Sequence, residues 1–135
     1  MDKQVTYDNE AEMGYIYLGE PYKYKISYTE ELPQNTDIML DFGNDLPIIG
    51  IELAGATAIK VKHLVDTVHI FKKATTADNE IFYSFRLHDK SVKQSVTHPD
   101  TAKIVFHFSD ADCLDFIGID IYDTDPYDET FLIGG

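Results

Sequence analysis

Lysine and arginine are scarce in this chain, and residues 104–135 contain neither. The 135 residues include 24 Asp and Glu but 11 Lys and Arg, which gives a formal net charge of −13. The balance is −8 over residues 1–59, +3 over 60–103 and −8 over 104–135. Proteins that bind nucleic acid or anionic membranes need a basic surface. We therefore expect neither partner, whereas a negative field would speed encounter with a basic protein and also aid solubility.

Cysteine and long apolar runs are also scarce. Cys113 is the single cysteine, so the chain cannot form an internal disulfide. No apolar stretch approaches the length that spans a bilayer. Residues 1–4 lack the basic segment and apolar run with which a signal peptide begins. These features favour a cytoplasmic protein.

Recognisable metal-binding and cofactor motifs are missing. The five histidines form no His-x-His or His-x-x-x-His pair, and one cysteine cannot complete a zinc site. Asp110-x-Asp112 and Asp123-x-Asp125 look like fragments of calcium loops, but the glycine and the closing glutamate of an EF-hand do not follow. No glycine-rich phosphate loop is present. We expect no metal and no cofactor.

Catalytic patterns are equally hard to find. No Gly-x-Ser-x-Gly elbow occurs. Asp112 and Asp115 lie beside Cys113, and their charges would raise the pKa of its thiol and lower its reactivity. Asp37 and Asp41 share one face of an expected strand and could act as acid and base, but we expect both at the surface. The sequence therefore predicts a protein that is not an enzyme.

The chain states one pattern twice. Residues 36–56 and 103–125 each contain an alternating apolar run, an acidic turn and a second apolar run. The second runs match as Ile49-Gly50-Ile51-Glu52-Leu53 and Ile117-Gly118-Ile119-Asp120-Ile121. Upstream of them, residues 14–18 correspond to residues 83–87. This self-similarity indicates a duplicated structural unit.

Alternation with a period of two dominates both copies and predicts short strands. Gly50 is expected to mark a bulge or a close backbone approach. Residues 54–66 are compatible with a short helix or a linking strand, and residues 131–133 with a last edge strand. The expected strands cover residues 13–18, 22–28, 37–42, 48–53, 80–87, 91–97, 103–108 and 115–122.

These strands predict an all-β, mainly antiparallel fold with little helix. Two similar β-meander repeats would pack as a sandwich or a partly open barrel, because each alone leaves an apolar face bare. We expect a single domain over residues 1–135. It would consist of repeats at about 1–57 and about 78–125, joined by a linker at 58–77.

The first repeat resembles a family of small bacterial proteins of unknown function. The family shows Tyr-Asp, then Tyr-Ile-x-Leu, then an acidic turn before Ile-Val-Gly-Ile-Glu-Ile. This chain has Tyr7-Asp8, Tyr15-Ile16-Tyr17-Leu18, and Asp41 followed by residues 48–53 as Ile-Ile-Gly-Ile-Glu-Leu. The resemblance covers about residues 6–57, and Leu46-Pro47 replaces the turn glycine of the family. It implies an association with small toxins, as an antitoxin or immunity protein.

Two groups of side chains are candidates for binding a partner. Six of the nine tyrosines fall within residues 7–28, and tyrosine is common in interfaces, although most of these would form the apolar face of a sheet. The acidic C-terminal region is the richer candidate. The predicted partner-binding residues are Asp110, Asp112, Asp115, Asp120, Tyr122, Asp123, Asp125, Tyr127, Asp128 and Glu129.

The hypothesis that follows is an acidic cytoplasmic binding module. It would be an immunity or antitoxin protein that neutralises a basic toxin, for example a nuclease, by occluding the toxin's active site. Acidic residues would pair with the toxin's phosphate-binding Lys and Arg, and aromatic residues would anchor the centre. The alternative is a duplicated structural or small-ligand-binding module with no toxin partner, which a pocket lined by Tyr and Phe would favour.

Overall fold

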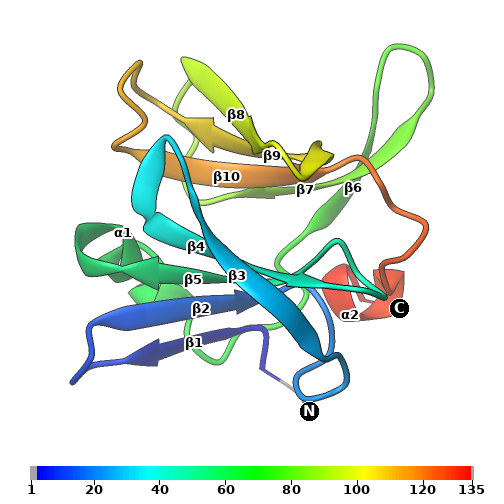
Figure 1. Cartoon of the computed structure of the whole chain (residues 1–135). Helices are drawn as coiled ribbons and strands as arrows, with labels where there is room; N and C mark the ends of the chain where they lie inside the picture. Colours follow the sequence, from blue (N-terminus) through cyan, green and yellow to red (C-terminus); the bar gives the residue numbers. More distant parts are fainter. Residues whose placement is uncertain (1–2, 135) are drawn as a thin grey trace.

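The first half of the chain forms a five-stranded antiparallel sheet (Figure 1). In the computed structural model, which describes residues 3–134, the strands lie side by side in the order β1-β2-β5-β4-β3. Consecutive strands are antiparallel neighbours except where the chain passes from β2 to the far edge at β3. The strand bounds are β1 Val5–Asp8, β2 Met13–Tyr17, β3 Ile26–Leu32, β4 Asn35–Gly43 and β5 Ile48–Ala54.

The second half repeats this topology. Its strands lie in the order β6-β7-β10-β9-β8, which is the order of the first sheet position by position. The two sheets stack face to face, and this confirms the predicted sandwich of two similar halves (Figure 1). β6 lies within the segment predicted to be a linker. The strand bounds are β6 Lys72–Thr75, β7 Ile81–Arg86, β8 Gln94–His98, β9 Thr101–Phe108 and β10 Phe116–Ile121.

One apolar core fills the space between the sheets. Ile16, Leu40 and Ile51 contribute from the first sheet, and Phe106 and Ile119 from the second, all with no exposed surface. Their neighbours along each strand point to the opposite face, because side chains alternate across a sheet. Each sheet therefore has a second face, turned away from the core, that carries its polar residues.

Two strand predictions were wrong. Residues 22–25 belong to a turn that follows Pro21, in which Tyr22 has a φ of 67°, and β3 runs instead from Ile26 to Leu32, beyond the expected end at residue 28. A sequence that alternates Tyr and Lys satisfies a strand pattern, but the left-handed backbone at Tyr22 interrupts any ladder there. Residues 131–133 are not an edge strand, since residues 129–132 form the short helix α2.

The ambiguous segment after β5 is helical. α1 spans Gly55–Ile59 and is followed by the 3₁₀ turn η1 at Lys62–Leu64. Ala58 and Val61 are fully buried, so this segment closes one end of the core. In the described part of the chain, 3–134, no helix has the length and apolar character needed to cross a membrane.

Tyr127 ties the C-terminal segment to the first sheet. Its hydroxyl donates a hydrogen bond to the Ile48 carbonyl (2.8 Å) and accepts one from the Ile48 amide (3.0 Å). Tyr127 is 6% exposed and Ile48 is fully buried, so water cannot easily replace either bond.

Replacing Tyr127 by phenylalanine is expected to lower the free energy of unfolding by about 1–3 kcal/mol, because two buried backbone groups lose their partner. Urea denaturation at pH 7 measures the change. Tyr22→Phe is the matched control, since Tyr22 is 99% exposed, and it should leave the free energy of unfolding unchanged. Equal stability of the two variants would contradict this role for the Tyr127 hydroxyl.

Candidate functional site

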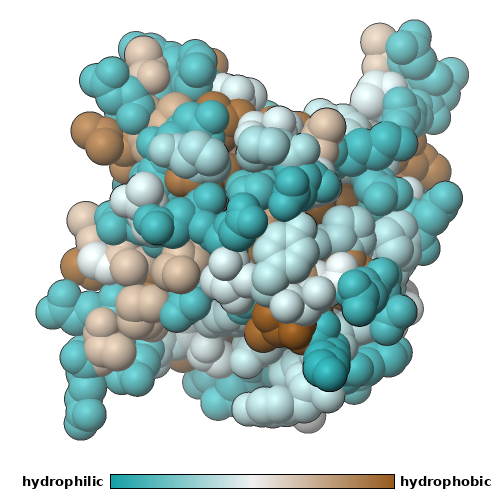
Figure 2. Space-filling model, in the orientation of Figure 1, coloured by the Kyte–Doolittle hydropathy of each residue, from teal (hydrophilic) through white to brown (hydrophobic). Residues whose placement is uncertain are grey.

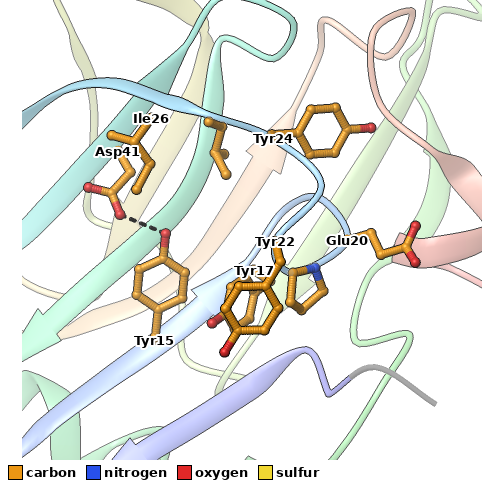
Figure 3. A pocket seen from close by; sticks show the side chains of 9 residues that line it. Tyr15, Tyr17, Glu20, Tyr22, Tyr24, Ile26 and Asp41 are labelled. Atoms are coloured by element: carbon orange, nitrogen blue, oxygen red, sulfur yellow. Dashed lines mark hydrogen bonds between the residues drawn. The ribbon is translucent and has the colours of Figure 1, made fainter.

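A pocket of about 240 Å³ opens on the outer face of the first sheet (Figure 3). Its floor comes from β2, β4 and β5, and its rim comes from the turn before β3. Figure 2 shows that hydrophilic side chains cover much of the molecular face drawn there, around a small hydrophobic patch. The residues that line the pocket are Tyr15, Tyr17, Glu20, Pro21, Tyr22, Tyr24, Ile26, Asp41 and Ile49.

Gly50 makes room for the floor of the pocket. It lies on β5, between Tyr17 on β2 and Asp41 on β4. The Tyr15 side chain reaches across this glycine toward β4, and a Cβ at position 50 would overlap its ring and hydroxyl. The pairing register also shifts between Asp41 and Phe42, opposite Gly50 and Ile48. The prediction of a bulge at Gly50 is confirmed by this register shift, whereas the close approach at Gly50 is made by the Tyr15 side chain and not by backbone.

Asp41 is the buried anion of the pocket. Its carboxylate is 5% exposed and accepts hydrogen bonds from the Tyr15 hydroxyl and the Thr29 hydroxyl, both at 2.6 Å. Within residues 3–134, no Lys, Arg or His forms an ion pair with this carboxylate. The expectation of a surface position for Asp41 was wrong, because Tyr15 folds over it (Figure 3).

The charge of Asp41 raises the pKa values of the acidic groups around it. Burial, the hydrogen bond to Asp41 and the charge of Asp41 all raise the pKa of Tyr15. Burial and Asp41 likewise raise the pKa of Glu52, and burial, Tyr22 and Asp41 raise that of Tyr17. All these shifts disfavour a further negative charge, so the pocket has a negative potential that nothing in its lining offsets.

Tyrosine rings form the walls of the pocket. Figure 3 shows the Tyr17 and Tyr22 side chains close together in the view and the Tyr24 ring apart from them, and all three line the pocket. Glu20 adds a second carboxylate at the rim. The Lys23 ammonium already lies over the outer Tyr24 ring, 5.6 Å from its centroid. Aromatic faces attract cations in this geometry, so rings and carboxylates here favour the same kind of ligand.

The second sheet carries a corresponding polar cluster on its own outer face. The register relates Arg86 to Tyr17, His107 to Asp41 and Asp120 to Glu52, because each holds the same place relative to Gly118 or Gly50. Arg86 binds the buried Asp120 with two hydrogen bonds, of 2.7 and 3.1 Å. His107 Nε2 lies 2.9 Å from the same carboxylate, and its Nδ1 lies 2.8 Å from the Ser95 hydroxyl.

The predicted acidic partner-binding residues do not form one surface. Asp110, Asp112 and Asp115 lie in the turn before β10, whereas residues 122–129 follow its other end. Six strand residues separate the two groups by about 20 Å. Asp110 accepts backbone hydrogen bonds from Leu114 and Asp115, and Asp115 binds Lys60, Lys90 and Ser109, so both stabilise the turn. Asp112 is exposed.

Several members of the other group are also engaged within the protein. Asp120 and Tyr127 are buried, with Arg86, His107 and Ile48 as partners, which corrects their prediction as contact residues. Asp128 caps α2, and Glu129 binds Lys73 and the Tyr83 hydroxyl. Tyr122 stacks on Phe82, and it lines a shallow pocket with Asp123, Asp125 and Lys103. Asp125 is exposed and Asp123 is half-buried, and neither forms a salt bridge within residues 3–134.

Burial affects the cysteine as well. Cys113 is 3% exposed, and its burial, together with Asp110 and Asp112, raises the pKa of the thiol. The direction agrees with the prediction, although the desolvation of the side chain is the largest cause. A buried thiol with a raised pKa is a poor nucleophile.

One group of side chains has the composition of a metal site. Ligand atoms of Glu30, His98 and Asp100 lie within 4.8 Å of one another. His98 Nδ1 accepts a hydrogen bond from the Asp100 amide, so a neutral ring carries its proton on Nε2, which faces Glu30 at 3.2 Å. This arrangement suits a hydrogen bond between the two sheets better than metal ligation by Nε2.

Comparison with known proteins agrees with this duplicated architecture. Residues 4–56, the first repeat, match a family model described as "Protein of unknown function (DUF2283)". The "Uncharacterized protein YuzE" of Bacillus subtilis (strain 168) is 33% identical over 131 residues, which cover 96% of this chain and 95% of that protein. This chain belongs to the same family as YuzE. The match to this relative extends over both repeats of the chain. No solved structure matches the chain.

The sequence identified tyrosine as a candidate contact residue but did not predict the pocket. The clustering of tyrosines in residues 7–28 was visible, and four of those six tyrosines line the pocket. Asp41 was missed because its burial depends on the Tyr15 ring crossing from a strand two positions away in the sheet. A glycine in the middle of an apolar strand was the available signal, since it marks a place where another side chain passes close by.

Proposed function

We propose that this protein is a cytoplasmic binding module for a basic protein, of the immunity or antitoxin kind, with no catalytic activity of its own. The observation that carries the proposal is Asp41, a buried carboxylate without a cationic partner in residues 3–134, set in a pocket walled by tyrosines. A buried charge is costly when it is unpaired, so a cation supplied from outside would stabilise this site.

The groups in the pocket favour binding over catalysis. Tyr15 and Tyr17 keep their protons, because their pKa values are raised. Each carboxylate oxygen of Asp41 already accepts a hydrogen bond from a hydroxyl group. None of the lining residues is a Ser, Cys, Lys or His that could serve as an activated nucleophile or base. Tyrosine rings instead supply contact area at low entropic cost, as they do in protein interfaces.

The proposed mechanism is occlusion. A toxin that acts on nucleic acid needs Lys and Arg to bind phosphate. The net charge of −13 would steer such a protein toward this one, and the pocket would hold one of its cationic side chains. The exposed acids Asp112 and Asp125, with the half-buried Asp123, would add contacts at the edge of the complex, where charges affect the rate of association more than affinity.

Binding to a basic partner is expected to weaken steeply with salt. The partner to test is a small basic protein encoded next to this gene, with its Kd measured by isothermal titration calorimetry at 50 and 300 mM NaCl. We expect a Kd at least tenfold weaker at the higher salt, because screening shortens the range of the acidic field. If the partner is a nuclease, equimolar protein should abolish its activity.

Asp41→Asn should weaken binding of that partner at least tenfold, whereas Asp78→Asn, at an exposed acid in the turn between β6 and β7, should change it little. The proposal fails if no neighbouring basic protein binds at 50 mM NaCl. It also fails if binding is unaffected by salt and by Asp41→Asn.

The second candidate is a small-ligand-binding protein without a toxin partner. The concave, tyrosine-lined pocket favours it, and its volume of about 240 Å³, slightly below the usual range for small-molecule sites, would restrict the ligand to a small one. The pocket lies within the first repeat and not between the halves, so a ligand there would not need the duplication. Binding of a small cation without any protein partner would select this candidate.

A further inference from the structure

We infer that the tyrosine pocket is a guanidinium site, which takes one arginine side chain of the partner. The inference rests on the proposed function and adds the chemistry of the group recognised. Its evidence is the buried Asp41 carboxylate with the tyrosine rings around it, and the second repeat shows that the same sheet geometry can hold a guanidinium on a buried carboxylate.

The outer face of the second sheet holds a guanidinium group on a buried carboxylate. There Arg86 extends over Gly118 and places its guanidinium on the buried Asp120 with two hydrogen bonds. The Asp120 side chain is 4% exposed, and the Arg86 guanidinium balances its negative charge. In the first sheet Tyr17 occupies the place of Arg86 and Glu52 that of Asp120, whereas the buried carboxylate Asp41 lies across Gly50 at the place of His107. The first sheet therefore has a buried carboxylate beside its glycine, but within residues 3–134 no guanidinium binds it.

The carboxylate of Asp41 has the acceptor capacity for such a group. Each carboxylate oxygen can accept two hydrogen bonds. Oδ2 accepts one from Tyr15 and Oδ1 accepts one from Thr29, so each oxygen retains one acceptor site. A guanidinium presents two parallel N–H groups that fit both oxygens at once, whereas an ammonium is a point charge.

The aromatic walls of the pocket also favour a guanidinium over an ammonium. A planar guanidinium stacks on aromatic faces and is less strongly hydrated than an ammonium, so it loses less on entering a site walled by Tyr17, Tyr22 and Tyr24. Glu20 at the rim adds a second negative charge. The volume of about 240 Å³ suits a single side chain and not a folded segment.

The test uses capped single amino acids as probes: acetyl-arginine methylamide, acetyl-lysine methylamide and the uncharged citrulline analogue. The chain contains no Trp, so its intrinsic fluorescence comes from tyrosine and reports on the pocket. We expect the arginine probe to bind with a Kd of roughly 1–10 mM at low salt. The lysine probe should bind at least fivefold more weakly, and the citrulline probe should give no saturable change.

Two variants locate the binding. Asp41→Asn should weaken the arginine probe at least tenfold, with Asp78→Asn as the control that keeps wild-type affinity. Tyr22→Ala should weaken binding of the arginine probe several-fold. Because Tyr22 is 99% exposed, this variant keeps the fold even if Asp41→Asn does not. A thermal melt of each variant establishes which ones are folded.

The outcomes separate the two claims. Equal affinity for arginine and lysine probes, or an unchanged affinity in Tyr22→Ala, would overturn the guanidinium site. No binding of the arginine probe, combined with salt-dependent binding of the basic protein, would also overturn it while the proposed function stands. Selective arginine binding without any basic protein partner would support the site and refute the proposed function.

Discussion

Replacing Asp120 by alanine is expected to lower the free energy of unfolding by about 2–3 kcal/mol. The carboxylate is buried beneath Arg86 and beside His107, and removing it leaves both without their shared acceptor. Arg86 is exposed and can be hydrated in the variant, whereas His107 is buried and loses a partner that water cannot easily replace. Urea denaturation at pH 7 measures the effect.

The same carboxylate should make the fold sensitive to acid. Burial alone would raise the pKa of Asp120, but hydrogen bonds from His107 and Arg86 outweigh it and hold that pKa below its ordinary value. Lys60 and Ser109 lower the pKa of Asp115 in the same way, against a smaller opposing effect of burial. A lowered pKa in the folded state contributes stability that is present above about pH 4 and is lost as the pH falls toward the folded-state value.

Two comparisons isolate this contribution. Lys3→Ala removes the exposed pair with Asp66 and should change the free energy of unfolding by less than about 1 kcal/mol. Asp120→Asn should lose less additional stability than wild type between pH 6 and pH 3, because it lacks the group that titrates. An alanine variant as stable as Lys3→Ala would show that the cluster around Asp120 is not a structural element.

The second large effect is expected at the glycine of the second repeat. A Cβ at position 118 would overlap the backbone carbonyl of Phe85 as well as the Arg86 side chain, and the paired strand cannot easily retreat. Gly118→Ala should therefore lower the free energy of unfolding by about 3 kcal/mol. Thermal and urea denaturation of the purified variant measure it.

Gly50→Ala is the matched variant in the first repeat. There the three atoms nearest to the added Cβ all belong to the Tyr15 side chain, which can swing toward solvent. We expect a smaller loss of about 1–2 kcal/mol, together with loss of the Tyr15 hydrogen bond to Asp41 and of binding in the pocket. A larger loss of stability in Gly50→Ala than in Gly118→Ala would contradict the stated difference between backbone and side-chain overlap.

The architecture could be predicted from sequence because it depends on local patterns that occur twice. Alternation placed most strands, and the pair of matching runs around Gly50 and Gly118 predicted the shared topology of the two sheets. The strands β1 and β6 were missed, since each is an edge strand of four residues with little apolar content. The Tyr-Lys alternation at 22–25 failed for the opposite reason, because a turn can carry the pattern of a strand.

The site was much less predictable. Its parts come from β2, β4, β5 and the turn before β3, so no window of sequence contains them. Charge density pointed instead to residues 110–129, where the fold uses acids such as Asp115, Asp120 and Asp128 to bind cations and backbone within the protein. Counting charges identifies the sign of the field but not which carboxylates are already paired.

An NMR titration of uniformly ¹⁵N-labelled protein with the capped arginine probe tests the pocket most directly. Shifts of amide resonances should concentrate on residues 15–26, 41 and 49–50, with those near Arg86 and residues 110–129 unchanged. Shifts that centre on the C-terminal acidic residues, or that spread evenly over both sheets, would contradict Asp41 and its tyrosines as the binding site.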